Sequence, residues 1–247
     1  MRLFDDAAAE YDAARPSYPA GLYDLLEVLV GGLAGKLVAD GGAGTGVATR
    51  QLADRGARVV AFDPAMGMLL RAVHRRPRLR AVVADAGAVP MRTCSLDMIC
   101  FAQSWHWVDQ RAGAAEAARL LRQAGWWAAW WNQPWADDEA WFDRYYSVLE
   151  QRCPGLSRQQ RNTDWCQDAI AALEEFDVPE RHIVWWERSV QVDEWMIDQR
   201  SHSYVSVLSE PERRRLLADL EAIVRDRFTD GHMTVPYQTR AWVARRR

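Results

Sequence analysis

The sequence predicts a doubly wound α/β fold, in which a mostly parallel sheet carries helices on both faces. Three observations support this prediction. Short apolar runs alternate with helical periods between residues 36 and 131. Four of the five runs lack polar alternation, which is typical of strands covered on both faces. The spacing leaves room for a helix between successive strands, and this favours right-handed βαβ units.

The first thirty residues predict a helix, a turn and a second helix. The segment Arg15-Pro16-Ser17-Tyr18-Pro19 cannot continue a helix, because each proline lacks an N–H and restricts the residue before it. From Leu22 to Val30 the apolar residues recur at helical spacing, and Gly31-Gly32 end the helix.

The central elements follow in a regular order. Strands are expected at 37–39, 59–62, 81–84, 98–102 and 126–131, and helices at 47–55, 66–73 and 114–121. In the last strand, Trp126 and Trp130 point to one face and Trp127 and Trp131 to the other. We expect most of these indoles to pack in the core between the sheet and the helices.

The pattern changes after Asn132. We expect a helix at 137–150, a loop at 153–165, a strand at 183–186 and a closing strand at 235–244. Ser209 and Glu212 form a capping-box signal for one further helix. Because no linker separates independent parts, residues 1–247 are predicted to form a single domain.

Composition limits the classes of function. The chain has 49% apolar and 26% charged residues and a net charge of −3, which disfavours a protein that holds nucleic acid by bulk charge. The basic residues between Arg71 and Arg80 are expected to form a solvated helix end. The four cysteines form no CxxC pair, so no metal site is expected. Without a leader or a long apolar run, we expect a cytoplasmic protein with no membrane partner. The oligomeric state cannot be read from the sequence.

A glycine-rich loop is the strongest chemical signal. The run from Asp40 to Gly46 follows a strand and opens a helix. Its glycines let the backbone approach a ligand closely, and the helix start offers free N–H groups. A dinucleotide fingerprint, G-x-G-x-x-G, would need a third glycine where Val47 stands. This argues against an NAD(P) oxidoreductase, while a tight βα turn without a ligand stays an alternative.

Two more acids end the next strands. Asp63 lies 23 residues after Asp40, and Asp85 lies 22 residues after Asp63. In open α/β sheets, ligands bind at the carboxyl ends of the strands. A carboxylate after the second strand suits a ribose diol, and one after the third can accept a hydrogen bond from an exocyclic amine. The acids and the glycine loop together predict a nucleoside site.

These residues resemble the class I S-adenosylmethionine-dependent methyltransferases, in the small-molecule type 11 branch that includes the ubiquinone/menaquinone and trans-aconitate methyltransferases. Asp40–Gly46, Phe62-Asp63-Pro64, Ala84-Asp85-Ala86 and Phe101–Trp107 match the family's motifs. Gly41 stands where the family usually has an aliphatic residue, which is expected to loosen the turn. The resemblance implies a Rossmann-like, seven-stranded, mostly parallel sheet with a helical insertion before strand six. It also implies lid helices at 1–32, a cofactor core at 33–133 and an acceptor side at 134–247.

The resemblance implies that S-adenosylmethionine is the methyl donor and S-adenosylhomocysteine the product, and that the acceptor is a small molecule. The residues expected to bind the cofactor are Tyr11, Arg15, Asp40, Gly41, Gly42, Gly44, Asp63, Pro64, Met66, Asp85, Ala86 and Gln103. The candidates for binding the acceptor are Trp107, Asn132, Trp135 and Tyr204.

The implied reaction is in-line methyl transfer to an O, N, S or C nucleophile. His106 is the candidate base, because it follows a strand on the cofactor side and an imidazole titrates near neutral pH. The alternatives are that His106 orients a substrate carboxylate, or packs between the neighbouring tryptophans. A non-catalytic protein that keeps the nucleoside pocket as a sensor or scaffold is also compatible with the sequence.

Overall fold

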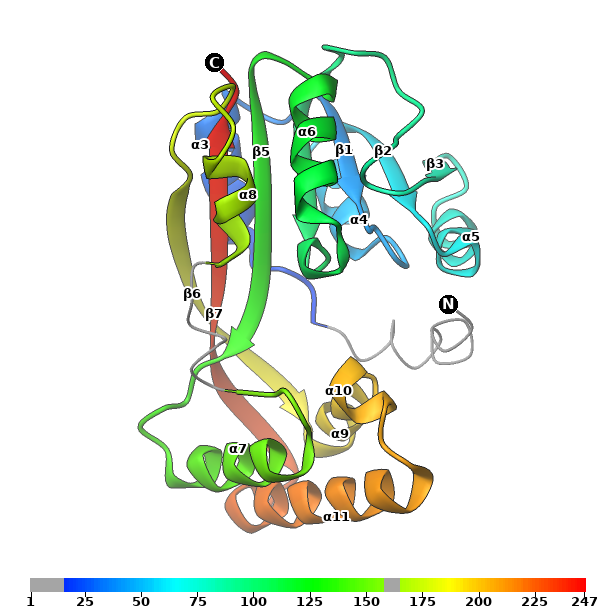
Figure 1. Cartoon of the computed structure of the whole chain (residues 1–247). Coiled ribbons are helices and arrows are strands. Elements are labelled where there is room, and N and C mark those ends of the chain that lie inside the picture. The colour runs from blue at the N-terminus through cyan, green and yellow to red at the C-terminus, as the bar shows by residue number, and fades with distance from the viewer. Residues whose placement is uncertain (1–15, 158–164) are drawn as a thin grey trace.

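The computed structural model describes residues 16–157 and 165–247, and it confirms the doubly wound α/β fold (Figure 1). Within these ranges the sheet has seven strands in the order β3-β2-β1-β4-β5-β7-β6. Strands β1 to β5 run parallel to one another, and β7 is antiparallel to β5 and β6. The strands are β1 (Leu37–Gly41), β2 (Arg58–Asp63), β3 (Arg80–Val83), β4 (Leu96–Ala102), β5 (Leu121–Pro134), β6 (Glu180–Gln191) and β7 (His232–Arg245).

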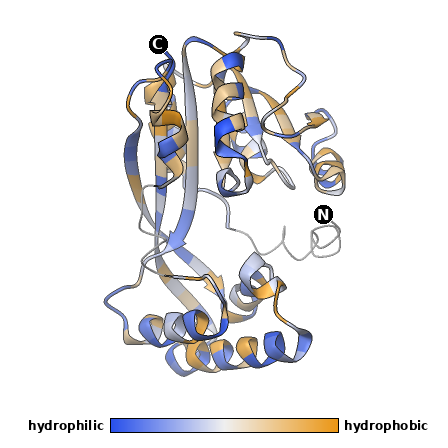
Figure 2. Cartoon of the chain, viewed as in Figure 1, coloured by the Kyte–Doolittle hydropathy of each residue, from blue (hydrophilic) through white to orange (hydrophobic). Residues whose placement is uncertain are grey.

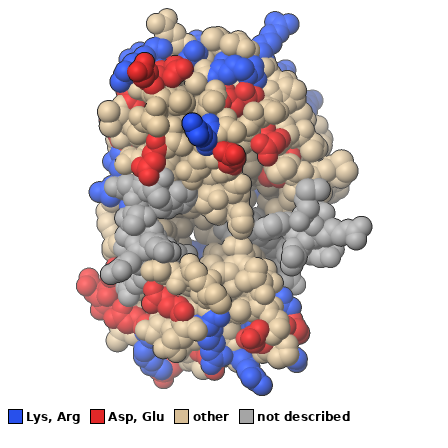
Figure 3. Space-filling view, viewed as in Figure 1, with Lys and Arg blue, Asp and Glu red and all other residues tan. Residues whose placement is uncertain are grey.

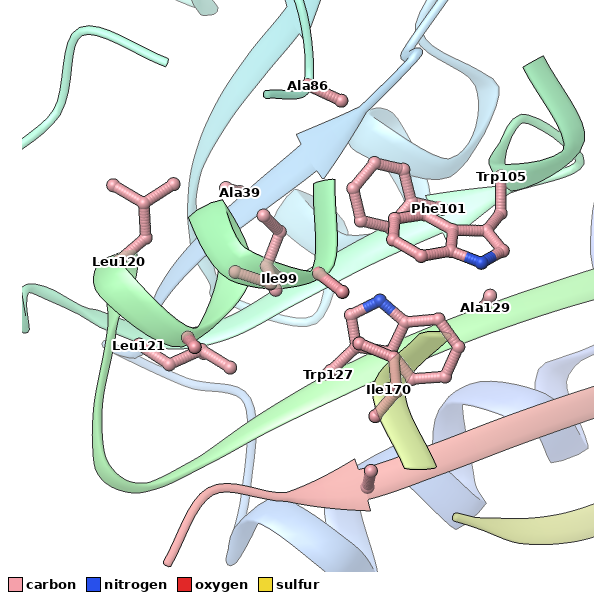
Figure 4. Close-up of a cluster of buried hydrophobic side chains, with 14 of the residues drawn as sticks. Ala39, Ala86, Ile99, Phe101, Trp105, Leu120, Leu121, Trp127, Ala129 and Ile170 are labelled. Atoms are coloured by element: carbon pink, nitrogen blue, oxygen red, sulfur yellow. The ribbon is translucent and has the colours of Figure 1, made fainter. Parts of the chain in front are cut away.

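Helices cover both faces of the sheet. On one face, α3 (Ala20–Val30) and α4 (Val47–Asp54) share an apolar cluster with β1, β4 and β5. On the other face, α6 (Gln110–Leu120) and α8 (Asp168–Ala171) pack on the same strands. Figure 4 shows this second cluster, with Phe101, Trp105 and Trp127 close together. The helix α5 (Met66–Arg75) lies beside β2 and β3.

The tryptophans of β5 divide between the two faces as predicted. Trp127 and Trp131 belong to the cluster under α6 and α8, whereas Trp126 and Trp130 belong to the cluster under α3. Trp127 and Trp130 are fully buried. Successive side chains of a strand point to opposite faces, so a strand buried on both sides carries large apolar residues at adjacent positions.

The strands β5, β6 and β7 extend beyond the rest of the sheet and carry a second group of helices (Figure 1). This group, called here the helical cap, consists of α7 (Ala140–Arg152), α9 (Val192–Arg200), α10 (Ser203–Ser206) and α11 (Glu210–Arg227). Its apolar side chains form a separate cluster. Polar and apolar residues mix along α7 and α11 (Figure 2), as expected of helices buried on one face.

The sequence patterns predicted only part of the helical cap. The capping box at Ser209 and Glu212 is confirmed. β6 runs from Glu180 to Gln191, well beyond the predicted 183–186, because exposed and covered residues alternate along it. Ser201 and His202 occupy the turn between α9 and α10. Among the described residues, no helix is both long and apolar enough to cross a membrane.

Asp40 is fully buried at the end of β1. Its Oδ2 accepts a hydrogen bond of 2.5 Å from the Thr49 hydroxyl of α4, so the carboxyl group ties the strand to the helix after the glycine loop. Burial raises the pKa of Asp40 from 3.8 to about 7, the hydrogen bond from Thr49 opposes the rise, and the nearby charge of Asp63 adds to it.

The Asp40→Asn variant should gain stability relative to the native protein as pH rises. The folded pKa of about 7 lies above the unfolded value of 3.8, so the contribution of Asp40 is complete below the unfolded pKa and is lost as pH rises to the folded one. The expected slope is about 1.4 kcal/mol per pH unit between these values. Urea unfolding of both proteins across this range measures the difference. The exposed Asp54→Asn variant is the control, and parallel curves for Asp40→Asn and the native protein would contradict the expectation.

Candidate functional site

The carboxyl ends of β1, β2 and β4 surround a cavity of about 320 Å³, called here the edge cavity. This is the edge of the sheet that faces the helical cap (Figure 1). Seven of the residues expected to bind the cofactor line it: Gly42, Gly44, Asp63, Pro64, Asp85, Ala86 and Gln103. Asp40, Gly41 and Met66 do not line it, and Tyr11 and Arg15 lie outside the described residues.

The glycine loop needs its glycines for two physical reasons. Gly42 and Gly44 have φ values of +62° and +55°, a backbone conformation that side chains disfavour. A Cβ on Gly42 would lie 2.5 Å from the Cβ of Ser104, whose hydroxyl donates a 2.6 Å hydrogen bond to the carbonyl of Gly41. The loop therefore lies directly against the residues that follow β4.

Gly41 does not loosen the turn, contrary to the expectation from the family's usual residue. A Cβ at this position would lie 2.4 Å from Cε1 of Phe101 and 2.6 Å from Cζ of Phe62. The two rings meet edge to face at 6.2 Å. The aromatic side chains from β2 and β4 thus fill the volume that an aliphatic residue would occupy in β1.

The acidic side chains differ in their surroundings. Asp63 is 8% exposed, and its carboxylate accepts hydrogen bonds from the backbone N–H groups of Gly44 at 2.9 Å and Ala65 at 2.8 Å. Burial raises the pKa of Asp63, and the two backbone hydrogen bonds oppose the rise. Asp85 is exposed, and its Oδ1 accepts a hydrogen bond from the N–H of Gly87 at 2.8 Å.

The methionine at the wall of the edge cavity is Met68 rather than Met66. Met66 begins α5 with 61% of its surface exposed, whereas Met68 is buried. Residues two positions apart in a helix are separated by about 200° around its axis, so Met66 and Met68 face opposite sides of α5. Sequence spacing alone could not decide which of the two faces the cavity.

A second cavity, of about 420 Å³, lies between the sheet edge and the helical cap. This cap cavity shares Pro16, Gln103 and Trp107 with the edge cavity. Figure 3 shows a hollow at this level, with mostly uncharged side chains around it on the face in view. Of the predicted residues, His106, Trp107, Asn132 and Tyr204 line the cap cavity, whereas Trp135 packs against Trp185 and lines neither cavity.

The segment after β4 reaches both cavities. It forms the short helix η1 (Trp105–Trp107), in which Trp105 is buried and donates a hydrogen bond to the carbonyl of Cys166 at 2.9 Å. This anchor leaves His106 and Trp107 exposed toward the cap cavity. The Nδ1 atom of His106 accepts a hydrogen bond from Nε1 of Trp131 at 3.2 Å.

A buried ion pair stands at the cap side. Nη1 of Arg188 donates to Oδ2 of Asp198 at 2.6 Å and to the hydroxyl of Tyr237 at 3.2 Å. Asp198 and Tyr237 line the cap cavity. Burial raises the pKa of Tyr237 well above its usual value, and the charge of Arg188 opposes the rise.

Sequence reasoning missed several of these lining residues. Ser104 lies inside the Phe101–Trp107 motif, but the neighbouring residues, rather than Ser104 itself, indicated a functional site. Asp198 and Arg240 lie on elements whose polar residues show no pattern, and only the fold brings them together. Among the described residues, no cluster of three or more His, Cys, Asp or Glu side chains could hold a metal ion.

The edge cavity fits an adenosyl group. It combines a cradle of backbone without side chains, two carboxylates at neighbouring strand ends and the start of α4, where Thr45, Val47 and Ala48 line the wall. A helix start suits a ligand that needs N–H donors. The two carboxylates accept hydrogen bonds, so the site suits a ligand with hydroxyl and amine groups rather than a pyrophosphate.

Comparisons with known proteins agree with this geometry. A family model described as "Methyltransferase domain" matches residues 39–129. An uncharacterized methyltransferase of Mycobacterium tuberculosis is 35% identical over 187 residues, covering 74% of this chain and 69% of the relative. The demethylmenaquinone methyltransferase of Beutenbergia cavernae is 31% identical over 177 residues, covering 68% of this chain and 73% of the relative.

Solved structures show the same fold. A protein from Anaeromyxobacter dehalogenans, described as a "Putative Type II Methyltransferase", superposes with a TM-score of 0.70 at 24% identity, covering 94% of this chain and 97% of the other. The motifs, the sheet order and the relatives lead to one conclusion. The chain belongs to the class I S-adenosylmethionine-dependent methyltransferases, in the type 11 branch, and S-adenosylmethionine is its methyl donor.

Proposed function

We propose that this enzyme methylates a small molecule held in the cap cavity while S-adenosylmethionine occupies the edge cavity. The observation that carries the proposal is the wall that the two cavities share, made by Pro16, Gln103 and Trp107. A methyl group at this junction can pass from one cavity to the other. The cap cavity, at about 420 Å³, has the size typical of sites for small ligands.

The edge-cavity residues predicted from the sequence have distinct roles in this proposal. The carboxylate of Asp63 binds the ribose hydroxyls with the lone pairs that its backbone donors leave, and Asp85 accepts a hydrogen bond from the adenine amine. Pro64 and Met68 flank the adenine ring. Ala86 and the glycines let the cofactor approach the backbone. Tyr11 and Arg15 stay predicted partners of the amino-acid end.

The protein contributes mainly position to the reaction. The cofactor's sulfonium supplies an activated methyl group with a neutral thioether as leaving group. Aligning the acceptor with that methyl group can lower the barrier by about 7–11 kcal/mol. Gln103 stands at the junction with φ +55°, and its N–H is fixed by a 2.8 Å hydrogen bond to the carbonyl of Trp130. The backbone there is held by the core rather than by a ligand.

A small acceptor is favoured over a macromolecule by the position of the cap. The cap cavity lies between the sheet edge and α7, α9 and α10, with residues from all of these elements in its wall. One relative is named a demethylmenaquinone methyltransferase, and this name describes a quinone compound as its acceptor rather than a macromolecule. The acceptor-side residues of this proposal are Trp107, Asn132 and Tyr204.

Replacing Asp63 should weaken cofactor binding. Asp63→Ala removes hydrogen bonds between a carboxylate and two hydroxyls, and we expect the Kd for S-adenosylhomocysteine to rise by about tenfold or more. Isothermal titration calorimetry measures this, and the native protein should give no heat with NADH. Asp54→Ala, an exposed acid paired with Arg76, is the matched control. An unchanged Kd in Asp63→Ala would refute the assigned role.

Filling the cap cavity should stop turnover and spare cofactor binding. Ser203 lines the cap cavity but not the edge cavity. An indole at this position occupies the space of the acceptor, so Ser203→Trp should lower the rate of S-adenosylhomocysteine formation about a hundredfold and leave the Kd for S-adenosylhomocysteine unchanged. The assay uses a panel of small hydroxyl, amine, thiol and carboxyl acceptors. Val207→Trp, at a position 75% exposed and outside both cavities, is the control. Equal turnover in Ser203→Trp and Val207→Trp would argue against an acceptor in this cavity.

A further inference from the structure

We propose that His202, oriented by Asp198, is the general base of the reaction, that His106 acts as a hydrogen-bond donor, and that the acceptor is a hydroxyl on an aromatic ring. This inference rests on the proposed function, because it places the acceptor in the cap cavity. His202, which precedes α10, then takes the role of base for which the sequence had favoured His106, which follows β4.

The backbone of His202 is firmly held at the wall of the cap cavity. Its carbonyl accepts hydrogen bonds from the N–H groups of Val205 and Ser206, both at 3.0 Å, and from the Ser206 hydroxyl at 3.1 Å. Its ring stacks on Tyr204, with centroids 5.0 Å apart and planes 10° from parallel. The imidazole therefore has a defined orientation before any acceptor binds.

Asp198 faces one nitrogen of this ring. Its Oδ1 lies 3.9 Å from Nε2 of His202, and its Oδ2 accepts the 2.6 Å hydrogen bond from Arg188. A carboxylate beside an imidazole stabilises the protonated ring. Because Asp198 faces Nε2, the proton from the acceptor is taken up at Nδ1. The distance of 3.9 Å is longer than a hydrogen bond, and contacts of this kind shorten when a substrate binds.

His106 has the opposite hydrogen-bond pattern. Its Nδ1 accepts the 3.2 Å hydrogen bond from the indole of Trp131. In a neutral imidazole whose Nδ1 is an acceptor, Nε2 carries the proton. Nε2 of His106 therefore carries an N–H, and a donor of this kind suits an oxygen acceptor such as a carbonyl or a neighbouring ring hydroxyl. It is a binding group in this scheme, and its loss affects KM.

Charged and titratable groups line the cap cavity together with His202, and they come from several elements. Asp198 on α9 is balanced by Arg188 on β6. Among the described residues, the phenols in this wall are Tyr204 on α10, Tyr145 and Tyr146 on α7 and Tyr237 on β7, and His106, Cys166 and Arg240 line it as well. Burial raises the pKa values of Tyr145 and Tyr237, so both stay neutral while an imidazole titrates.

The proton balance of the step defines the acceptor class. The hydroxyl oxygen bonds to the methyl carbon as the carbon–sulfur bond breaks, the electron pair stays on sulfur, and the hydroxyl proton moves to Nδ1 of His202. One positive charge leaves sulfur and one appears on the imidazole. A phenol fits, because its proton is acidic enough for an imidazole to remove during transfer. Trp107, Trp131 and Trp242 provide flat apolar walls for its ring.

The test compares phenol, catechol and 2-naphthol with aniline, thiophenol and benzoate, and follows S-adenosylhomocysteine formation against pH. In the native enzyme, kcat for the phenols should rise with pH through the imidazole range and then level off. In His202→Asn, kcat should fall about a hundredfold and this rise should disappear, with KM little changed. His106→Gln should raise KM and keep the rise. His232→Asn, an exposed histidine outside both cavities, is the control.

A second measurement needs no acceptor and covers Asp198. Nitrogen-detected NMR of the imidazoles should show Nδ1 of His106 unprotonated, and the pKa of His202 should fall in Asp198→Asn, where the protonated ring loses its carboxylate. Because Asp198→Asn leaves Arg188 without its partner, its Tm is measured in parallel, and Asp198→Glu should restore the higher pKa.

Three results would overturn the inference. They are a kcat rise retained in His202→Asn, a pKa of His202 that is the same in Asp198→Asn, and phenols that stay unmethylated. Calorimetry with S-adenosylhomocysteine in the same samples separates this failure from that of the proposed function. Tight binding with no phenol turnover rejects the base and acceptor class alone, whereas absent binding rejects the proposed function too.

Discussion

The carboxylate of Asp63 joins the ends of β1 and β2, two of the strand ends around the edge cavity. One of its oxygens accepts the N–H of Gly44 in the loop after β1, and the other accepts the N–H of Ala65 after β2. Burial raises the pKa of Asp63, and the two N–H donors compensate part of the cost of removing its carboxylate from water. The same group fixes the loop and faces the cavity, so the shape of the cofactor site and its polarity depend on one side chain.

Most of the edge cavity could be predicted from sequence because it is built locally. The loop, Asp63 and Asp85 follow consecutive strands of a parallel sheet, and such strand ends meet by construction. The wrong predictions concern the direction in which a side chain points from its helix or strand. Met68 faces the cavity where Met66 was expected, and the fully buried Asp40 holds Thr49 beneath the loop. Periodicity locates an element, but the way a helix rotates against the sheet depends on packing.

The cap cavity could not be predicted in the same way. Its wall combines the segment after β4, the end of β5, the turn after α9 and the middle of β7. The hydrogen bond between Trp131 and His106 spans 25 residues, and that between Arg188 and Tyr237 spans 49. No local pattern encodes such pairs, because each residue alone is compatible with a core or a surface. Tyr204 was noted only from the family resemblance.

The ion pair of Arg188 and Asp198 is costly for a folded protein. Removing two charges from water carries a desolvation penalty that a hydrophobic pair of similar size would avoid. Arg188 recovers part of this cost over the rings of Trp195 and Tyr237, at 5.6 Å and 6.0 Å. In the cap, whose other large side chains already form an apolar cluster, stability alone would favour a hydrophobic pair. The carboxylate of Asp198 is balanced by Arg188 on one side and faces the cap cavity on the other. Such a charge is suited to stabilise a proton that arrives during the reaction.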